Sequence, residues 1–151
     1  LPAELAETPL IEISSDPTPL IRQLAAYILG LIPTDAAQAR LKVLMENPDG
    51  ATRLNAAIGL ARQGSSQGYE VMKTELQAVN QEVAPTSNEE VLLFTRISNA
   101  LKALQQIAGV LSDTQADELR DIVKPLANDF REIKLRMDAK QLLMALDERK
   151  K

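Results

Sequence analysis

The stretch that decides the fold is DPTPLIRQLAAYILG, which runs from Asp16 to Gly30. Its apolar residues recur every three or four positions in two neighbouring rows, Leu20, Leu24, Ile28 and Leu31 in one and Ile21, Ala25, Leu29 and Ile32 in the other. This spacing predicts an α-helix with a wide apolar face. We expect Thr18 to cap it, Pro19 to occupy its first position, and Gly30 with Pro33 to end it.

The pattern of this helix returns 31 residues later, which indicates an internal repeat. The matched residues are Arg22, Ala25, Ala26 and Leu29 in the first copy and Arg53, Ala56, Ala57 and Leu60 in the second. A further copy stands at Arg136, Ala139 and Leu143, and a degraded one at Arg96, Asn99 and Ala103. The small alanines let neighbouring helices approach closely, so stacking of the repeats would complete a core that no single repeat can bury.

The rest of the chain also reads as helices separated by turns, with no credible strand. After a short helical turn or extended arm over residues 1–18 and the helix just described, helices are predicted from 34 or 35, after the turn at 47–50, over 69–77, from 87, from 112 and over 129–147. Capping boxes are expected at Ser87 with Glu90 and at Ser112 with Gln115. Pro125 should kink or end the helix that contains it.

Asp16, Arg22, the small residues after it and Leu29-Gly30 together resemble the first helix of a HEAT repeat. The resemblance is clear over residues 16–77 and divergent over 88–147, and it implies one domain over 1–151, an α-solenoid of about three to four helical hairpins. It also implies a hydrogen-bonded ladder between repeats, in which each Arg meets an acceptor six positions earlier. The ladder residues are Asp16, Arg22, Asn47, Arg53, Glu90, Arg96 and Arg136. Phe130, six before Arg136, offers no acceptor.

The composition excludes several kinds of chemistry. The chain has neither Cys nor His, so it cannot build a thiol nucleophile, a Ser-His dyad or a Cys/His zinc site. Its net charge of −4 and pI of about 4.9 argue against a general nucleic-acid binder. No apolar run approaches the roughly 20 residues that span a bilayer. Because the first residue is Leu1, we expect the chain to be part of a longer protein.

The predicted function is a non-catalytic interaction module that binds a protein or peptide, without cofactor or metal, on a curved face made by the second helices. Its polar positions are Gln38, Lys42, Lys73, Gln77, Asp121 and Lys124. One alternative is an enzyme or enzyme subunit, because HEAT-like families include chromophore lyases and a DNA glycosylase type. Another is a structural helical domain packed on a further part of a larger protein.

Two further patterns favour structural explanations. Asp113, Asp117 and Asp121 form a carboxylate row that could hold a divalent cation, but acids near a helix N-terminus also have a simple electrostatic role. The last helix carries two apolar rows, and we expect the preceding hairpins to bury both of them. The alternatives for the second row are a continuation of the chain in the full protein and a docking surface for a partner. The second row comprises Phe130, Ile133, Met137 and Met144.

Overall fold

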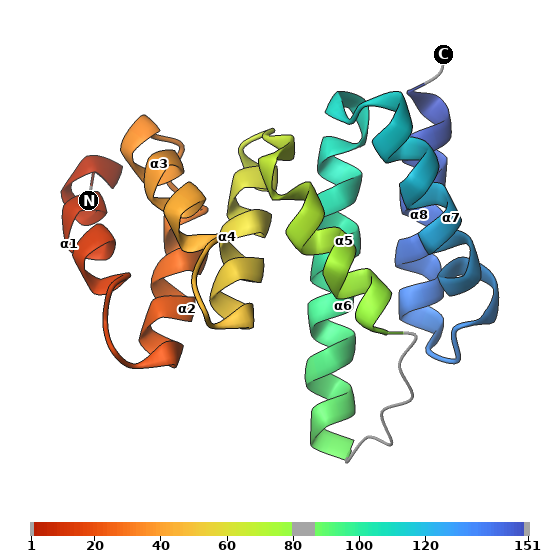
Figure 1. Ribbon diagram of the computed structural model, residues 1–151, viewed down its shortest axis with the longest axis horizontal. Helices are drawn as coiled ribbons and strands as arrows, with labels where there is room; N and C mark the ends of the chain where they lie inside the picture. Colours follow the sequence, from red (N-terminus) through yellow and green to blue (C-terminus); the bar gives the residue numbers. More distant parts are fainter. Residues whose placement is uncertain (1, 80–86, 150–151) are drawn as a thin grey trace. The chain divides into compact units, whose positions relative to one another are not determined.

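The computed structural model describes residues 2–79 and 87–149, and within these ranges its regular secondary structure is all helix, joined by turns (Figure 1). The prediction of an all-α fold is therefore confirmed, and the described residues contain no strand. The chain divides into two compact units, one of Leu1–Val71 and one of Met72–Lys151. Each unit is a set of packed helices with its own buried residues.

The first unit contains α1 (Ala3–Ile13), α2 (Pro19–Leu29), α3 (Asp35–Leu44), α4 (Gly50–Arg62) and the short 3-10 helix η1 (Ser66–Gly68). Helix α5 (Tyr69–Ala78) begins in this unit and continues into the second. The second unit also contains α6 (Ser87–Ile107), the 3-10 helix η2 (Ala108–Val110), α7 (Asp113–Asp129) and α8 (Ile133–Glu148).

Local sequence signals set most helix ends. Thr34 caps α3 by accepting a hydrogen bond from the Ala37 N–H, and Asp49 caps α4 in the same way through Thr52. Both bonds of the capping box at Ser112 and Gln115 are present at the start of α7, as predicted. Thr18 stands at the cap position of α2 but makes no side-chain cap bond there.

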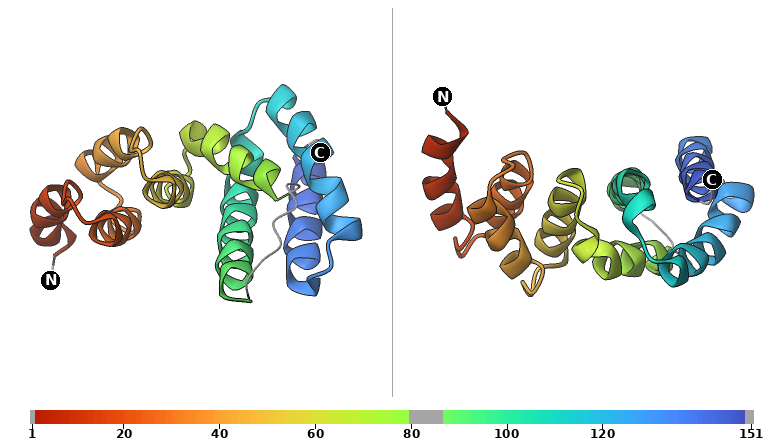
Figure 2. Two further views of the ribbon diagram at one scale, coloured as in Figure 1. Left: turned by 60° about the horizontal axis from the view of Figure 1, so that its bottom comes forward. Right: turned by 90° about the horizontal axis from the view of Figure 1, so that it is seen from above.

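The core of the first unit lies between α2, α3 and α4. It comprises Ala26, Leu29, Ile32, Ala37, Leu41, Leu44, Ala56 and Leu60, with Leu10 and Ile11 of α1 packed against it. Helices α2 and α4 run side by side in the same direction (Figures 1 and 2). They touch through backbone, because a Cβ built on Gly59 would lie 2.8 Å from the Cα of Gly30.

In the second unit, α8 packs against both α6 and α7. Apolar residues spaced three or four apart along and just after α6 are buried, although the helix itself ends at Ile107; they are Ile97, Leu101, Leu104, Ala108 and Leu111. Arg120 of α7 is buried as well, and its guanidinium donates to the main-chain oxygen of Leu146 at 2.6 Å and to Asp117 at 2.6 Å. A fixed, always-charged fork is suited to such a position between two helices.

Several sequence-based expectations about the ends of the chain are wrong. Residues 3–13 form a full helix, α1, which tolerates Pro9 and packs against α2 and α3. Of the two predicted effects of Pro125, a kink or an end of the helix, the end does not occur, because α7 continues to Asp129. Asp121, whose carbonyl loses its helical donor, is exposed to solvent. The last helix begins at Ile133 and not at residue 129.

The second apolar row of the last helix also differs from the expectation. Leu135, Ala139, Leu142 and Leu146 are buried, whereas Ile133, Met137 and Met144 are exposed. The preceding helices contact only one side of α8, so a second row cannot be covered by them. The predicted capping box at Ser87 depends on side chains outside the described residues.

Candidate functional site

The arginines that reveal the repeat are bonded inside their own repeat. Arg22 Nη1 donates to the main-chain oxygens of Asp16 at 2.9 Å and Pro17 at 2.8 Å. Arg53 Nη1 repeats this geometry with the main-chain oxygens of Asn47 at 2.7 Å and Pro48 at 2.9 Å. The position six residues before each Arg therefore supplies a main-chain carbonyl, while its side chain closes the turn by accepting from an N–H two residues later.

Other polar residues make the hydrogen bonds that cross from one repeat to the next. Gln23 Nε2 donates to Asp49 Oδ2 at 3.0 Å, and Asn55 Nδ2 donates to the main-chain oxygen of Gln23 at 3.0 Å. Gln63 Nε2 reaches the main-chain oxygen of Ile32 at 3.0 Å. Sequence reasoning missed these three side chains, because Gln and Asn on a helix surface carry no distinctive spacing signal.

The Asp49 carboxylate accepts hydrogen bonds from both α2 and α4. Burial acts to raise the pKa of its carboxyl, but the hydrogen bonds from the Thr52 hydroxyl, the Thr52 N–H and Gln23, with the positive charge of Arg22, lower the pKa below its ordinary value. The carboxylate thus caps α4 and holds α2 at the same time.

In the second unit, two of the proposed ladder residues, Arg96 and Glu90, form ion pairs with side chains. Arg96 pairs with Glu75 of α5, with an N–O distance of 2.7 Å, and Glu90 pairs with Arg131. The partners of Arg96 and Glu90 therefore differ in kind from the main-chain carbonyls that Arg22 and Arg53 contact.

The six predicted partner-face positions lie on α3, α5 and α7, the second helices of the hairpins that begin with α2, α4 and α6. In the first unit, Gln38 is half-buried on α3 and Lys42 is exposed on it. In the second unit, Lys73 of α5 forms an ion pair of 3.0 Å with Glu118 of α7, which brings these two helices together. The remaining positions of that unit, Gln77, Asp121 and Lys124, are exposed, and Asp121 lies 4.0 Å from Lys124.

A protein-family model for HEAT repeats matches residues 7–84, which is more than half of the chain. The chain belongs to the HEAT-repeat family. HEAT repeats commonly mediate protein interaction, and the family is generally non-catalytic scaffolding. The chain matches no curated protein. None of the described helices is long and apolar enough to cross a bilayer.

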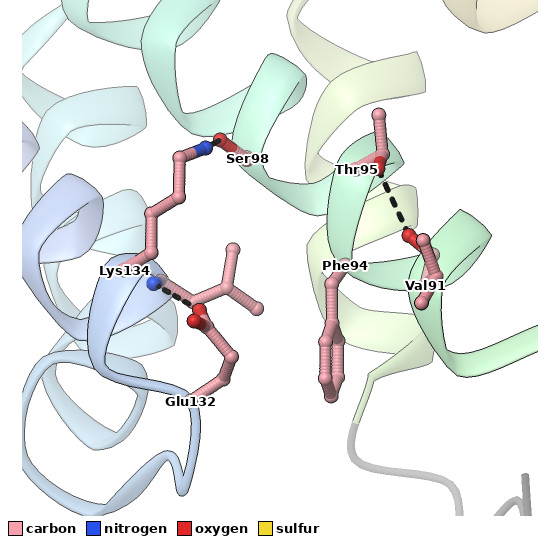
Figure 3. A pocket seen from close by; sticks show the side chains of 7 residues that line it. Val91, Phe94, Thr95, Ser98, Glu132 and Lys134 are labelled. Atoms are coloured by element: carbon pink, nitrogen blue, oxygen red, sulfur yellow. Dashed lines mark hydrogen bonds between the residues drawn. The ribbon is translucent and has the colours of Figure 1, made fainter. Parts of the chain in front are cut away.

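This HEAT-repeat chain has a small hollow of about 170 Å³ in its second unit, between α6 and the start of α8 (Figure 3). Three apolar and four polar residues line it: Val91, Phe94 and Leu135, and Thr95, Ser98, Glu132 and Lys134. The rings of Phe94 and Phe130 pack in a T-shaped arrangement, with ring centroids 5.6 Å apart. A cavity of about 150 Å³ holds one molecule the size of benzene, so this hollow suits a single side chain.

Ser98, beside this hollow, bonds to a lysine and an aspartate. These residue types occur in nucleophilic centres, but their arrangement here does not activate the serine. Its hydroxyl donates to Asp138 Oδ2 at 2.6 Å. It accepts from Lys134 Nζ at 2.8 Å (Figure 3). Lys134 Nζ also lies 3.8 Å from the same carboxylate, and the Ser98 hydroxyl donates to Asp138 and not to the lysine. These three groups connect α6 to α8, and we interpret them as a structural pin.

The aspartates at the start of α7 form ion pairs with arginine side chains. Asp113 accepts from Arg149 at 2.9 Å and Asp117 from Arg120 at 2.6 Å. Within the described part of the chain, no group of three or more acidic, Cys or His side chains is arranged to hold a metal ion. The arrangement therefore favours helix-end pairing for this row.

Proposed function

We propose that this chain is a non-catalytic interaction module that binds a protein or peptide on the second helices of its hairpins. The observation that carries the proposal is its membership of the HEAT-repeat family, whose repeats commonly mediate protein interaction. The chemistry of the surface supports it, because the second helices present exposed side chains of both charges. Such mixed polarity fits the rim of a protein interface better than a phosphate backbone.

The proposed contact positions are Lys42 on α3 in the first unit and Gln77, Asp121 and Lys124 on α5 and α7 in the second. The repeat arginines have a different role, since Arg22 and Arg53 are bonded to the turns before their own helices. Replacing those arginines would test folding, whereas replacing exposed lysines tests binding.

The experiment places a photo-crosslinking amino acid at single exposed positions of the full chain. In the first unit, a crosslinker at Lys42 should capture a protein from cell extract that a matched control at Thr18, beside the first helix, does not capture. In the second unit, a crosslinker at Lys124 should capture a protein that a matched control at Lys102, on the first helix α6, does not capture. Lys42→Glu and Lys124→Glu should then weaken binding of the protein captured at the same position, and Lys102→Glu should leave it unchanged. Equal capture from face and control positions, or no capture at either, would contradict the proposal.

A further inference from the structure

Helix α6 begins earlier in its repeat than the other first helices. Helices α2, α4 and α8 each start three residues before the repeat arginine, whereas α6 starts nine residues before Arg96. Ser98 and Asp138 each stand two residues after their repeat arginine and bond to each other, so α6 and α8 lie in register. The additional residues of α6, 87–92, therefore project past the start of α8 in the second unit (Figure 1).

The turn between α7 and α8, residues 130–132, is held against this projecting end of α6 by two contacts. The rings of Phe94 and Phe130 pack together, and the Arg131 guanidinium pairs with the Glu90 carboxylate. A short turn covers less of α6 than a further stretch of α8 would cover. The hollow of about 170 Å³ described above lies at this point, so the early start of α6 explains why it exists.

The lining of the hollow runs from buried to exposed residues. Ser98 and Leu135 line it and are only 3% and 2% exposed, whereas Val91 is 63% exposed. The Ser98 hydroxyl is fixed by its bonds to Asp138 and Lys134. The hollow is thus open to solvent, and its inner wall is already held in place. A largely pre-formed concave site with an apolar lining and a few placed polar groups is typical of ligand binding.

One carboxylate at the hollow has no opposite charge beside it. Lys134 lies 3.8 Å from the Asp138 carboxylate, and the arginine of the turn is paired with α6. Glu132, by contrast, forms no ion pair with any residue that the structure describes. Its Oε2 accepts from the Leu135 N–H at 2.7 Å and so caps α8, while its Oε1 takes no hydrogen bond from the described residues. The lining therefore combines an apolar surface with one uncompensated negative charge.

We propose that the hollow binds one apolar side chain of a peptide segment of another protein, in which a basic residue stands next to that side chain. The apolar side chain packs against Val91, Phe94 and Leu135, and the basic group pairs with Glu132. A cavity of about 150 Å³ holds benzene, so the side chain of phenylalanine or leucine fits. The site lies on the first helices α6 and α8, so it is independent of the face proposed on the second helices.

A side chain carried by a longer segment suits this hollow better than a free small molecule does. Small-molecule sites bury about 70–90% of their ligand, and this hollow is open at Val91. Leu92, the next residue of α6, is 66% exposed, so the projecting end of the helix offers apolar surface to the neighbours of the inserted side chain. The apolar contacts supply attraction, and the charge on Glu132 selects a basic neighbour over an acidic one.

The test is an NMR titration of the isotope-labelled full chain with blocked tripeptides. The peptide acetyl-Lys-Phe-Lys-amide should shift the amide signals of Thr95 and Leu135, which line the hollow, and leave those of the first unit in place. Acetyl-Lys-Ala-Lys-amide has the same charge without the ring, and it should bind about tenfold more weakly. Acetyl-Glu-Phe-Glu-amide should bind about two- to fivefold more weakly, which is the scale of one exposed ion pair.

Three variants, whose own spectra report whether the fold is kept, locate the site. Thr95→Phe fills the hollow from an exposed position of α6 and should abolish the shifts, whereas Val110→Phe, at an exposed position off the hollow, should bind like the parent chain. Glu132→Gln keeps an oxygen for the α8 cap but removes the charge, so most of the preference for lysine over glutamate should disappear.

Four results would overturn the proposal. They are an absence of shifts at the hollow, equal binding of the phenylalanine and alanine peptides, unchanged binding by Thr95→Phe, and tighter binding of the glutamate peptide than of the lysine peptide. None of them bears on capture at Lys42 or Lys124, so failure here is distinguishable from failure of the proposed function.

Discussion

Replacing Gly59 with Ala tests how closely α2 and α4 approach. The new Cβ would lie 2.8 Å from the Cα of Gly30 and 3.2 Å from a methyl carbon of Leu41. The nearer atom is main chain, which cannot rotate away, so the two helices must separate. Inserting a methyl group into a packed site costs about 1–3 kcal/mol, and a backbone obstacle places this case in the upper half of that range.

A second effect has the opposite sign. Ala is favoured over Gly in the middle of a helix by about 1 kcal/mol, and Gly59 lies within α4. We therefore expect the free energy of unfolding to fall by about 1–2 kcal/mol. Gly50→Ala is the control on the same helix, because its Cβ would meet only the flexible end of Arg53 at 3.4 Å. That variant should be as stable as the parent chain or slightly more stable.

The assay is urea unfolding followed by tyrosine fluorescence. The chain has no Trp and two Tyr, Tyr27 and Tyr69, and both lie in the first unit. The signal therefore reports the unit that contains Gly59 without a contribution from the second. If Gly59→Ala were as stable as Gly50→Ala, the close backbone contact would not be a feature of the folded protein.

Three further substitutions test caps and buried charge. Asp49→Ala should lower the free energy of unfolding by about 0.5–2 kcal/mol through loss of the α4 cap. Because folding lowers the pKa of Asp49, the stability that this carboxylate contributes is present above about pH 3.9 and is lost as the pH falls through the folded pKa. Acid unfolding of the variant should therefore depend less on pH than that of the parent chain. Arg120→Ala should cost about 1.5–3 kcal/mol, measured by circular dichroism, since the main-chain oxygen of Leu146 loses a charged donor. Ser112→Ala should cost about 0.5–2 kcal/mol, because it removes one bond of the α7 capping box, and Gln115→Ala, which keeps the serine bond, should cost less.

The sequence by itself determined the helical class, the repeat and most helix starts. These features depend on local physics: apolar spacing, proline at a first turn, and caps such as Thr34, Asp49 and Ser112 that bond within three residues. The register of Arg22, Arg53 and Arg136 was readable for the same reason, since each copy repeats one local pattern.

The tertiary structure alone decided which apolar rows are covered. Both rows of α2 are apolar, yet Ala25 and Leu29 are buried while Leu24 is exposed, because the helices that contact α2 leave Leu24 uncovered. The same holds for Met137 and Met144 of α8. Likewise Arg22 bonds to main-chain carbonyls, whose direction depends on how the turn is folded and not on which residue occupies it. Burial depends on contacts with residues that are distant in the sequence, and the local spacing of apolar residues does not predict those contacts.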